Sequence, residues 1–462
     1  MIITLLAIVA ILYLALYLED SFKVPSPLGL IILSFGIHAL MGSHFALIGN
    51  TKDFALLVIF LLPILLVSDS LELSVADLKK HGLSLFYLAV VAVALSVLAA
   101  LLMGNTLFSE YHLSTAAIIV LFAMVLATDP VSVVSVFSKF TLPHQLKILC
   151  EGESLFNDAT ALIVFVFIGL YALDGGEITT AYVTEVSVLV VLGSAALGVA
   201  FGYIGLLLMK STTNRTAEML ILIFVGYASF ELAEYFYLLL NVLGMHSHMH
   251  LSGILTCIFA VITVNHHMMQ AAADGEIALN QQEEDLKEKR DVANWVVSAA
   301  ISKIKATVEE RERHERTKED IQLLALVANT ILFVAMAELI DASLLWQYKT
   351  EIITMFVATT VIRAVMMAKF ALITTRTHKM ANMNFRWWGV LTFAGIKGGL
   401  SVVMLMMIPP TFEHLEMFKA VVIGVILLST FIYSGILIAL ISKYQAIFSK
   451  EKAEENTHEQ SL

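Results

Sequence analysis

The sequence is poor in charged residues and in cysteine. Only 15% of its 462 residues are charged and 59% are hydrophobic, whereas soluble domains carry about 25% charged and about 45–50% apolar residues. This imbalance excludes an ordinary soluble domain and indicates an integral membrane protein. Cys150 and Cys257 are the only cysteines and lie in or near apolar stretches, so no disulfide framework is implied. No basic stretch precedes the first apolar run, which predicts a retained first helix rather than a signal peptide.

Long apolar runs dominate the chain instead. Continuous runs of roughly 20 residues predict an all-α polytopic membrane protein with about 13 transmembrane helices. The alternating segments of about 10 residues that are typical of a membrane β-barrel are absent. The expected spans are 2–17, 28–47, 54–71, 84–103, 114–137, 154–173, 183–209, 219–240, 251–264, 321–340, 352–374, 387–407 and 418–441.

The basic residues of the short connecting segments are unevenly distributed. An odd number of spans places the two termini on opposite sides of the membrane. If the C-terminus is cytoplasmic, the outside segments hold only Lys52, Lys349 and Lys419, and all other basic residues of the short connections lie inside. This asymmetry predicts an N-terminus outside and a C-terminus in the cytoplasm.

Four regions follow from this topology. Residues 1–270 are expected to hold transmembrane helices 1–9, and residues 321–442 helices 10–13. Residues 271–320 are rich in Glu, Lys, Arg and Ala and contain no proline, which predicts a charged, helical, cytoplasmic segment that serves as a solvated linker or as a regulatory element. The tail 443–462 is expected in the cytoplasm, with its polar end disordered.

Two predicted spans contain residues that break helices. Thr128-Asp129-Pro130 interrupts the fifth span, and Gly395-Ile396-Lys397-Gly398-Gly399 interrupts the twelfth. Breaks of this kind persist in membrane helices where they line a cavity or a binding site. The fifth and twelfth helices are the middle members of helices 4–6 and 11–13, which run in opposite directions. The pattern therefore predicts an inverted-repeat antiporter fold with broken helices 5 and 12 and a site near the midplane.

Carboxylates in the sixth span are the candidate ion site. Ser154 and Asp158 are four residues apart and share one helical face, and Glu153 and Asn157 share another face about 100° away that can anchor to a neighbouring helix. Hard cations prefer oxygen ligands, which Ser154, Asp158, Asp129 and the freed carbonyls around Thr128 would supply. Desolvation favours the protonated form of a buried carboxyl. Asp158 can therefore hold either a proton or a cation, which is sufficient for exchange.

Three further charged residues lie in or near the broken spans, and each is expected to bind the ion, pair with another charge or compensate a helix dipole. Asp129, next to Pro130, either contacts the ion or offsets the positive end of a half-helix. Arg363, in the middle of the eleventh span, needs a buried anion, and Glu153 is the natural candidate. Lys397 lies between the glycines of the twelfth span, where it can neutralise the opposing ends of helix dipoles.

Histidines form two groups outside the candidate site. His246, His248 and His250 alternate in a predicted outside loop, whereas His266 and His267 follow the ninth span. On the predicted topology these groups lie on opposite faces of the membrane, so we expect no shared transition-metal site. This disfavours a metal-dependent membrane enzyme, and we expect neither an enzyme nor a cofactor.

The two motifs together resemble a known family. Ala127-Thr128-Asp129-Pro130, followed by Gly152-Glu153-Ser154-Leu155-Phe156-Asn157-Asp158-Ala159, closely resembles the monovalent cation/proton antiporters of the NhaP and NHE type. The resemblance implies that Asp158 is the ion and proton carboxylate, with Asp129, Ser154 and the Thr128 backbone nearby. It also implies a structural ion pair between Glu153 and Arg363. Asn157, in place of a second aspartate, resembles the electroneutral branch.

The resemblance also implies an assembly, and the sequence departs from the family pattern in three places, one of which is the pair of apparent insertions formed by the His-rich loop and residues 271–320. A homodimer is expected, in which helices 4–6 and 11–13 form the ion-transporting core and helices 1–3 and 7–9 belong to the dimerisation domain. Where many relatives carry a glutamate late in helix 3, this chain has Ser68, and the neighbouring Asp69 is expected to substitute for it. Lys397 stands where relatives often have arginine.

These observations predict a secondary-active Na⁺/H⁺ antiporter in a prokaryotic inner membrane. It is expected to be electroneutral, to work by alternating access in pH homeostasis, and to bind monovalent cations, protons and lipid but no nucleic acid. The alternative within transport is an antiporter for K⁺, Li⁺ or monovalent cations in general. The alternative of another class is a membrane sensor that signals through residues 271–320.

Overall fold

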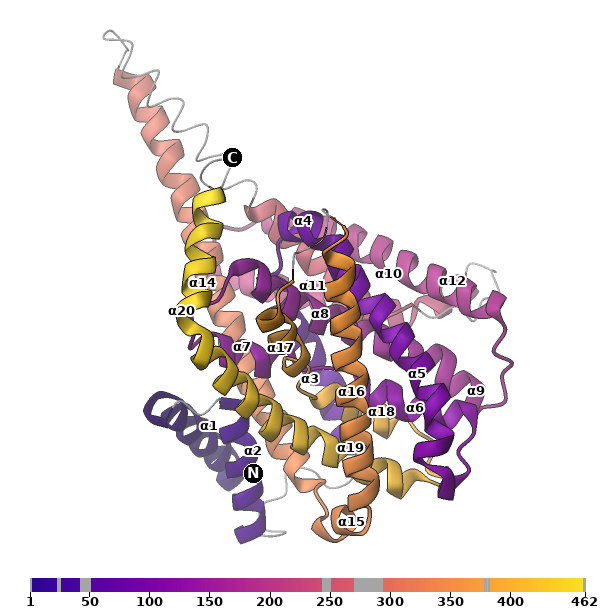
Figure 1. The fold of residues 1–462 in the computed structure, drawn as a ribbon. Coiled ribbons are helices and arrows are strands. Elements are labelled where there is room, and N and C mark those ends of the chain that lie inside the picture. The colour runs from indigo at the N-terminus through magenta and orange to yellow at the C-terminus, as the bar shows by residue number, and fades with distance from the viewer. Residues whose placement is uncertain are drawn as a thin grey trace. The chain divides into compact units, whose positions relative to one another are not determined.

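The structure is a computed structural model, and it describes residues 2–22, 26–41, 51–242, 251–269, 294–377, 380 and 383–459. All regular secondary structure in these residues is helical (Figure 1). Eight of the described helices are long and apolar enough to cross a membrane, and two shorter apolar helices are Leu28–His38 and Gly253–Met269. The predicted all-helical membrane fold is confirmed, whereas the total of about 13 spans stays a prediction.

The chain divides into two compact units. The first comprises Met1–Leu62, Asp77–Ser187 and Val327–Leu462, and the second comprises Pro63–Ala76 and Val188–Leu326. Helices mainly of the first unit are α1 (Ile2–Phe22), α2 (Ser26–Met41), α4 (Val75–Phe86), α5 (Ala92–Leu107), α6 (Thr115–Leu126), α7 (Pro130–Phe137), α8 (His144–Ile163), α9 (Tyr171–Leu173), α15 (Ala342–Gln347), α16 (Lys349–Thr374), α17 (Phe385–Phe393), α18 (Gly399–Met406), α19 (Leu415–Leu428) and α20 (Ser434–Glu459). Helices mainly of the second unit are α10 (Thr180–Met209), α11 (Arg215–Glu234) and α12 (Phe236–Val242), while α3 (Thr51–Glu72) and α14 (Asn294–Glu338) run through both.

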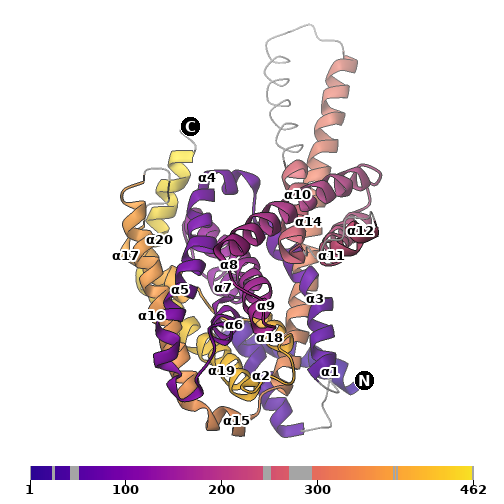
Figure 2. The same cartoon turned by 90° about the vertical axis from the view of Figure 1, so that its right-hand side faces the viewer.

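Helix α6 lies at the centre of the first unit. Every residue from Ala116 to Leu126 is buried, and the helix packs against α5, α8, α18 and α19 (Figures 1 and 2). A helix that is apolar on all sides can be surrounded by other helices in this way without burying polar groups. Its end at Leu126 therefore brings the first predicted break into the interior of the unit.

In the second unit, α10 packs closely on the helix Gly253–Met269. A Cβ atom on Gly198 would lie 2.5 Å from the carbonyl oxygen of Thr256, and one on Gly202 would lie 2.6 Å from Cβ of Thr263. Small residues at such positions let the backbones of membrane helices approach each other.

Several helices extend beyond their predicted spans. The span expected at 154–173 begins at His144, and the one expected at 84–103 begins at Val75, because hydropathy detects only the apolar part of a longer helix. Helix α14 continues without a break across the boundary expected at residue 320, since no glycine or proline occurs between Asn294 and Glu338. The part of the charged segment at 270–293 lies outside the described residues.

The expectation of a disordered C-terminal end is wrong, because α20 continues to Glu459. Two of its carboxylates bind other helices. Glu455 accepts hydrogen bonds from the backbone N–H groups of His144 (2.7 Å) and Gln145 (3.0 Å) at the start of α8. Glu451 accepts from Trp387 Nε1 at 2.9 Å and from Arg386 Nη2 at 2.7 Å. These contacts explain why a polar stretch is ordered.

Candidate functional site

Two helix interruptions meet in the first unit. Helix α6 ends at Leu126 and α7 begins at Pro130, while α17 ends at Phe393 and α18 begins at Gly399. The backbone N–H of Asp129, in the first interruption, donates a hydrogen bond of 2.7 Å to the carbonyl oxygen of Ile396 in the second. Each break leaves backbone N–H and C=O groups without a partner in their own helix. Some of these groups form hydrogen bonds with the other break, as a buried backbone requires.

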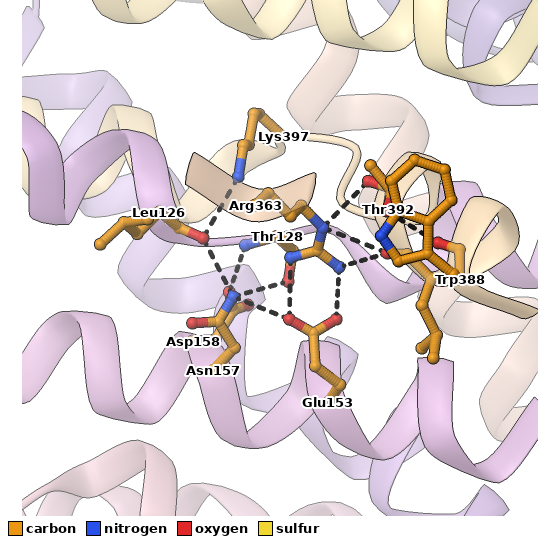
Figure 3. A network of polar contacts seen from close by, with 10 residues as sticks. Leu126, Thr128, Glu153, Asn157, Asp158, Arg363, Trp388, Thr392 and Lys397 are labelled. Atoms are coloured by element: carbon orange, nitrogen blue, oxygen red, sulfur yellow. Dashed lines mark hydrogen bonds and ion pairs between the residues drawn. The ribbon is translucent and has the colours of Figure 1, made fainter. Parts of the chain in front are cut away.

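Asp158 on α8 lies at the first interruption. Its Oδ1 accepts a hydrogen bond of 2.8 Å from the backbone N–H of Thr128, and the side chain is 9% exposed (Figure 3). One helical turn earlier, the hydroxyl of Ser154 is fully buried and has no hydrogen-bond partner within the described part of the chain. A buried hydroxyl without a partner is costly in a structure, and it is an available oxygen ligand beside a carboxylate.

Asn157 connects the second polar face of α8 to the same interruption. Its Nδ2 faces the carbonyl oxygen of Leu126 at 3.0 Å, Thr128 Oγ1 at 3.3 Å and Glu153 Oε1 at 3.4 Å (Figure 3). The two faces of α8 therefore contact one break from two sides. Asn157 anchors α8 to the end of α6.

Glu153 and Arg363 form a buried, bidentate ion pair. Arg363 on α16 donates from Nη1 to Oε1 at 2.9 Å and from Nη2 to Oε2 at 2.7 Å (Figure 3). Its Nε donates to the carbonyl oxygen of Thr392 at 3.0 Å, and Nη2 also donates to that of Leu391 at 3.0 Å. The pair joins α8 and α16, and the carbonyl bonds add α17. A buried pair is tolerated when further hydrogen bonds satisfy its remaining donors, as here.

Lys397 stands in the second interruption and reaches the first. Its Nζ donates to the carbonyl oxygen of Leu126 at 3.3 Å, and its backbone N–H donates to Ser429 Oγ at 3.1 Å. The ammonium group thus lies at the C-terminal end of α6, where the helix dipole favours positive charge. The same carbonyl also accepts from Asn157, so it is not available as the ion ligand that was expected from the break.

Asp129 caps α7. Its Oδ1 accepts a hydrogen bond of 3.2 Å from the backbone N–H of Val131, and Oδ2 accepts one from the hydroxyl of Ser132. Pro130 occupies the first helical position, where its fixed φ and missing N–H suit a helix start. Of the two roles considered for Asp129, this geometry favours compensation of the helix dipole.

Glycines in the second interruption allow these close approaches. A Cβ atom on Gly395 would lie 2.3 Å from Nε of Arg363, and one on Gly398 would lie 2.5 Å from Cβ of Asp129. Sequence reasoning located the glycine cluster but missed these contacts and the backbone acceptors at Leu126, Leu391 and Thr392. The acceptors leave no signal in the sequence, because every residue carries a carbonyl group.

Other residues expected near the site lie elsewhere. Ser68, which is buried, and Asp69 belong to the part of α3 in the second unit, and their contribution to ion binding stays a prediction. The loop with His246, His248 and His250 lies outside the described residues. Within the described residues, no group of three or more His, Cys, Asp or Glu side chains could hold a metal ion.

Comparison of the sequence with known proteins gives consistent matches. The sequence model of a family described as sodium/hydrogen exchanger, transmembrane, matches residues 4–272. The Na⁺/H⁺ antiporter NhaG of Bacillus atrophaeus is 32% identical over 192 residues, which are 40% of this chain and 35% of that protein. Sodium/hydrogen exchanger 7 of Arabidopsis thaliana is 30% identical over 192 residues, which are 41% of this chain and 17% of that protein. The chain thus matches less than half the length of these curated relatives.

Comparison of structures supports the same fold over nearly the whole chain. The sodium proton antiporter MjNhaP1 from Methanocaldococcus jannaschii superposes with a TM-score of 0.67 at 15% sequence identity. The match covers 94% of this chain and 98% of that one. The two chains therefore share the antiporter fold.

Proposed function

Because the chain belongs to the sodium/hydrogen exchanger family of transmembrane proteins, we propose that it is a secondary-active antiporter that exchanges Na⁺ for H⁺ at Asp158. The observation that carries this proposal is the buried carboxylate of Asp158 at a helix interruption, one turn from the hydroxyl of Ser154, which has no hydrogen-bond partner among the residues that the structure describes. Carboxylate and hydroxyl oxygens suit a hard cation, and the same carboxylate can bind a proton instead.

The neighbouring carboxylates have other roles in this proposal. Glu153 neutralises Arg363, and Asp129 caps α7. Competition of one cation and one proton for Asp158 moves no net charge across the membrane when each turnover exchanges one for the other. Asn157, which is neutral, adds no second titratable group directly beside Asp158 in the sequence. The exchange is therefore electroneutral.

Transport itself requires alternating access to Asp158 from the two sides of the membrane. The two interruptions support this, because broken membrane helices around a buried site are typical of transporters that expose one site alternately. We place the protein in a prokaryotic inner membrane with its C-terminus in the cytoplasm, as a homodimer, with helices 4–6 and 11–13 in the moving core.

The test is exchange in proteoliposomes that contain the purified chain and a fluorescent dye for the pH gradient. We expect Na⁺ to dissipate the gradient with the wild-type chain and not with Asp158→Asn. Asp174→Asn, which changes an exposed aspartate in a turn, is the matched control and should exchange normally. Exchange by Asp158→Asn would contradict the proposal.

The same vesicles decide the transported cation and the charge balance. Adding Na⁺, Li⁺ and K⁺ in turn distinguishes a Na⁺/H⁺ antiporter from one for K⁺ or for monovalent cations in general. Clamping the membrane potential with an ionophore should leave the exchange rate unchanged. A rate that follows the potential would contradict electroneutral exchange.

A further inference from the structure

A large cavity lies in the second unit. Its volume is about 1030 Å³, and its walls are the last turns of α10 with the following loop, the end of the helix Gly253–Met269, and the part of α14 near Glu310 and Arg313. A cavity of this size accommodates a small organic molecule or part of a lipid. None of the residues in the proposed exchange site contributes to it.

The cavity lies where two apolar helices end. The candidate span Thr180–Met209 ends there, as does the apolar helix Gly253–Met269, and the charged part of α14 passes beside them. Apolar spans match the hydrocarbon thickness of the bilayer. The cavity is therefore at the level of the lipid headgroups.

Charges of both signs line the polar wall. Lys210 and Arg313 supply positive charge, and Glu309 and Glu310 supply negative charge. Nε of Arg313 donates to Glu218 Oε2 at 2.8 Å. A polyanion such as a nucleotide would be repelled by Glu309 and Glu310, and a simple cation by Lys210 and Arg313. A zwitterion that carries a phosphate and an amine complements both.

A buried network holds the arginine in place. Glu218 Oε1 also accepts from Nδ1 of His314 at 2.7 Å, and Nε2 of His314 lies 3.2 Å from Oδ1 of Asn265. Glu218 and His314 are buried, so the carboxylate that positions Arg313 is itself fixed. The basic side of the cavity is thus formed before any ligand arrives, which reduces the entropic cost of binding.

The opposite wall is apolar and continues along α10. Tyr203 and Leu207 line the cavity, and the helix exposes Leu192 (64%), Val199 (37%), Tyr203 (51%) and Leu207 (68%). Their spacing of seven, four and four residues places them on one helical face. An apolar stripe therefore leads from the cavity along the membrane span, and an acyl chain fits it.

From this combination we propose that the cavity binds a phospholipid with a phosphoethanolamine headgroup. Its phosphate interacts with Lys210 and Arg313, its amine donates to Glu310, and an acyl chain lies along α10. We expect the binding to be specific for the headgroup, because the charged wall interacts with the phosphate and the amine. An acyl chain contacts only the apolar stripe and cannot distinguish one headgroup from another. The proposal does not depend on the transported ion.

The test uses the purified full chain, delipidated in detergent, with lipids of identical acyl chains. We expect phosphatidylethanolamine to raise the thermal unfolding midpoint at a lower concentration than phosphatidylglycerol, which lacks the amine. Phosphatidylcholine should also be weaker, because its quaternary ammonium cannot donate a hydrogen bond to Glu310. Glu310→Gln should reduce the preference for phosphatidylethanolamine over phosphatidylglycerol by about 3- to 10-fold, as for the loss of a charge-assisted hydrogen bond.

Matched variants on α14 provide the controls. Glu319→Gln changes an exposed glutamate that does not line the cavity and should keep the preference, and Lys210→Gln should weaken all three phospholipids. Equal stabilisation by the three headgroups, or a preference unchanged in Glu310→Gln, would overturn the proposal. Equal stabilisation by soluble glycerophosphoethanolamine would also overturn it, because the site would then bind a free metabolite rather than a lipid.

Discussion

Nζ of Lys397 lies 3.3 Å from the carbonyl oxygen of Leu126, the last residue of α6. Lys397 belongs to the interruption between α17 and α18, so one broken helix supplies the cation that the end of the other requires. Asp129 provides the opposite charge at the start of α7. The ends of both half-helices at the first interruption are therefore compensated by the side chains of Lys397 and Asp129, which agrees with the preferences of the helix dipole.

We expect Lys397→Met to destabilise the protein only moderately, by about 1–2 kcal/mol. The variant removes the positive charge, but the carbonyl oxygen of Leu126 still accepts a hydrogen bond from Asn157. Lys397→Arg retains the charge and should unfold closer to the wild-type temperature. Thermal unfolding in detergent measures both variants. A larger loss for Lys397→Met than for Arg363→Ala would contradict this assignment.

Arg363→Ala should lower the free energy of unfolding by about 3–5 kcal/mol, because it leaves Glu153 as an uncompensated buried charge. It also removes the donors to the carbonyl oxygens of Leu391 and Thr392, so we expect a larger loss than for Glu153→Gln. In the double variant Arg363→Met with Glu153→Gln, no buried charge is left over, and the combined loss should be smaller than the sum of the single losses. A stable Arg363→Ala variant that lacks only exchange would show that the pair is not structural.

Asn157→Asp should destabilise the fold although it changes few atoms. The new carboxylate cannot donate to Leu126 or Thr128, and it would lie about where Nδ2 lies now, 3.4 Å from Glu153 Oε1. Loss of a buried hydrogen-bond donor, together with the repulsion between two like charges, lowers the free energy of unfolding by about 2–4 kcal/mol. We expect a lower unfolding temperature that recovers partly at acidic pH, where a carboxyl group is protonated. An unchanged unfolding temperature would show that Asn157 does not anchor α8.

Ser154→Ala should separate ion binding from stability. The hydroxyl has no partner within the described structure, so its removal leaves no protein group unsatisfied, and stability should change by less than about 0.5 kcal/mol. If the hydroxyl is a cation ligand, half-maximal exchange should require several-fold more Na⁺. Ser96→Ala is the control, because the Ser96 hydroxyl only donates to the carbonyl oxygen of Ala92 on its own helix. An unchanged Na⁺ requirement in Ser154→Ala would remove this residue from the site.

Gly395→Ala and Gly399→Ala form a matched pair four residues apart. A methyl group on Gly395 would meet Nε of Arg363 at 2.3 Å, whereas the nearest atom to one on Gly399 is Leu332 Cδ1 at 3.7 Å. We expect Gly395→Ala to displace the guanidinium and to cost about 2–4 kcal/mol, and Gly399→Ala to be tolerated. Similar unfolding temperatures for the two variants would contradict the packing described here.

Sequence reasoning could predict which helices break and which charges must find partners. That Arg363 meets Glu153 follows from the cost of a buried unpaired charge. The acceptors at Leu126, Leu391 and Thr392 could not be predicted, because they depend on the register between helices far apart in the chain. That Asp129 caps α7 could not be predicted with certainty either, since an N-cap and an ion ligand use the same oxygen atoms.

The extent of the helices was the least predictable feature of the fold. Hydropathy finds the apolar part of a helix, and the polar start of α8 lies outside that part. Its first turn is stabilised by Glu455, more than 300 positions later in the chain, and nothing in the local sequence around His144 indicates this partner.

The contacts of α20 also constrain the order in which the protein can be completed. The chain is synthesised from its N-terminus, so α8 and α17 are made before the carboxylates that hold their first turns. The hydrogen bonds from His144 and Gln145 to Glu455, and those from Arg386 and Trp387 to Glu451, can form only after these two glutamates have been synthesised. Until α20 has been made and has packed against α8, the start of α8 lacks these two hydrogen bonds.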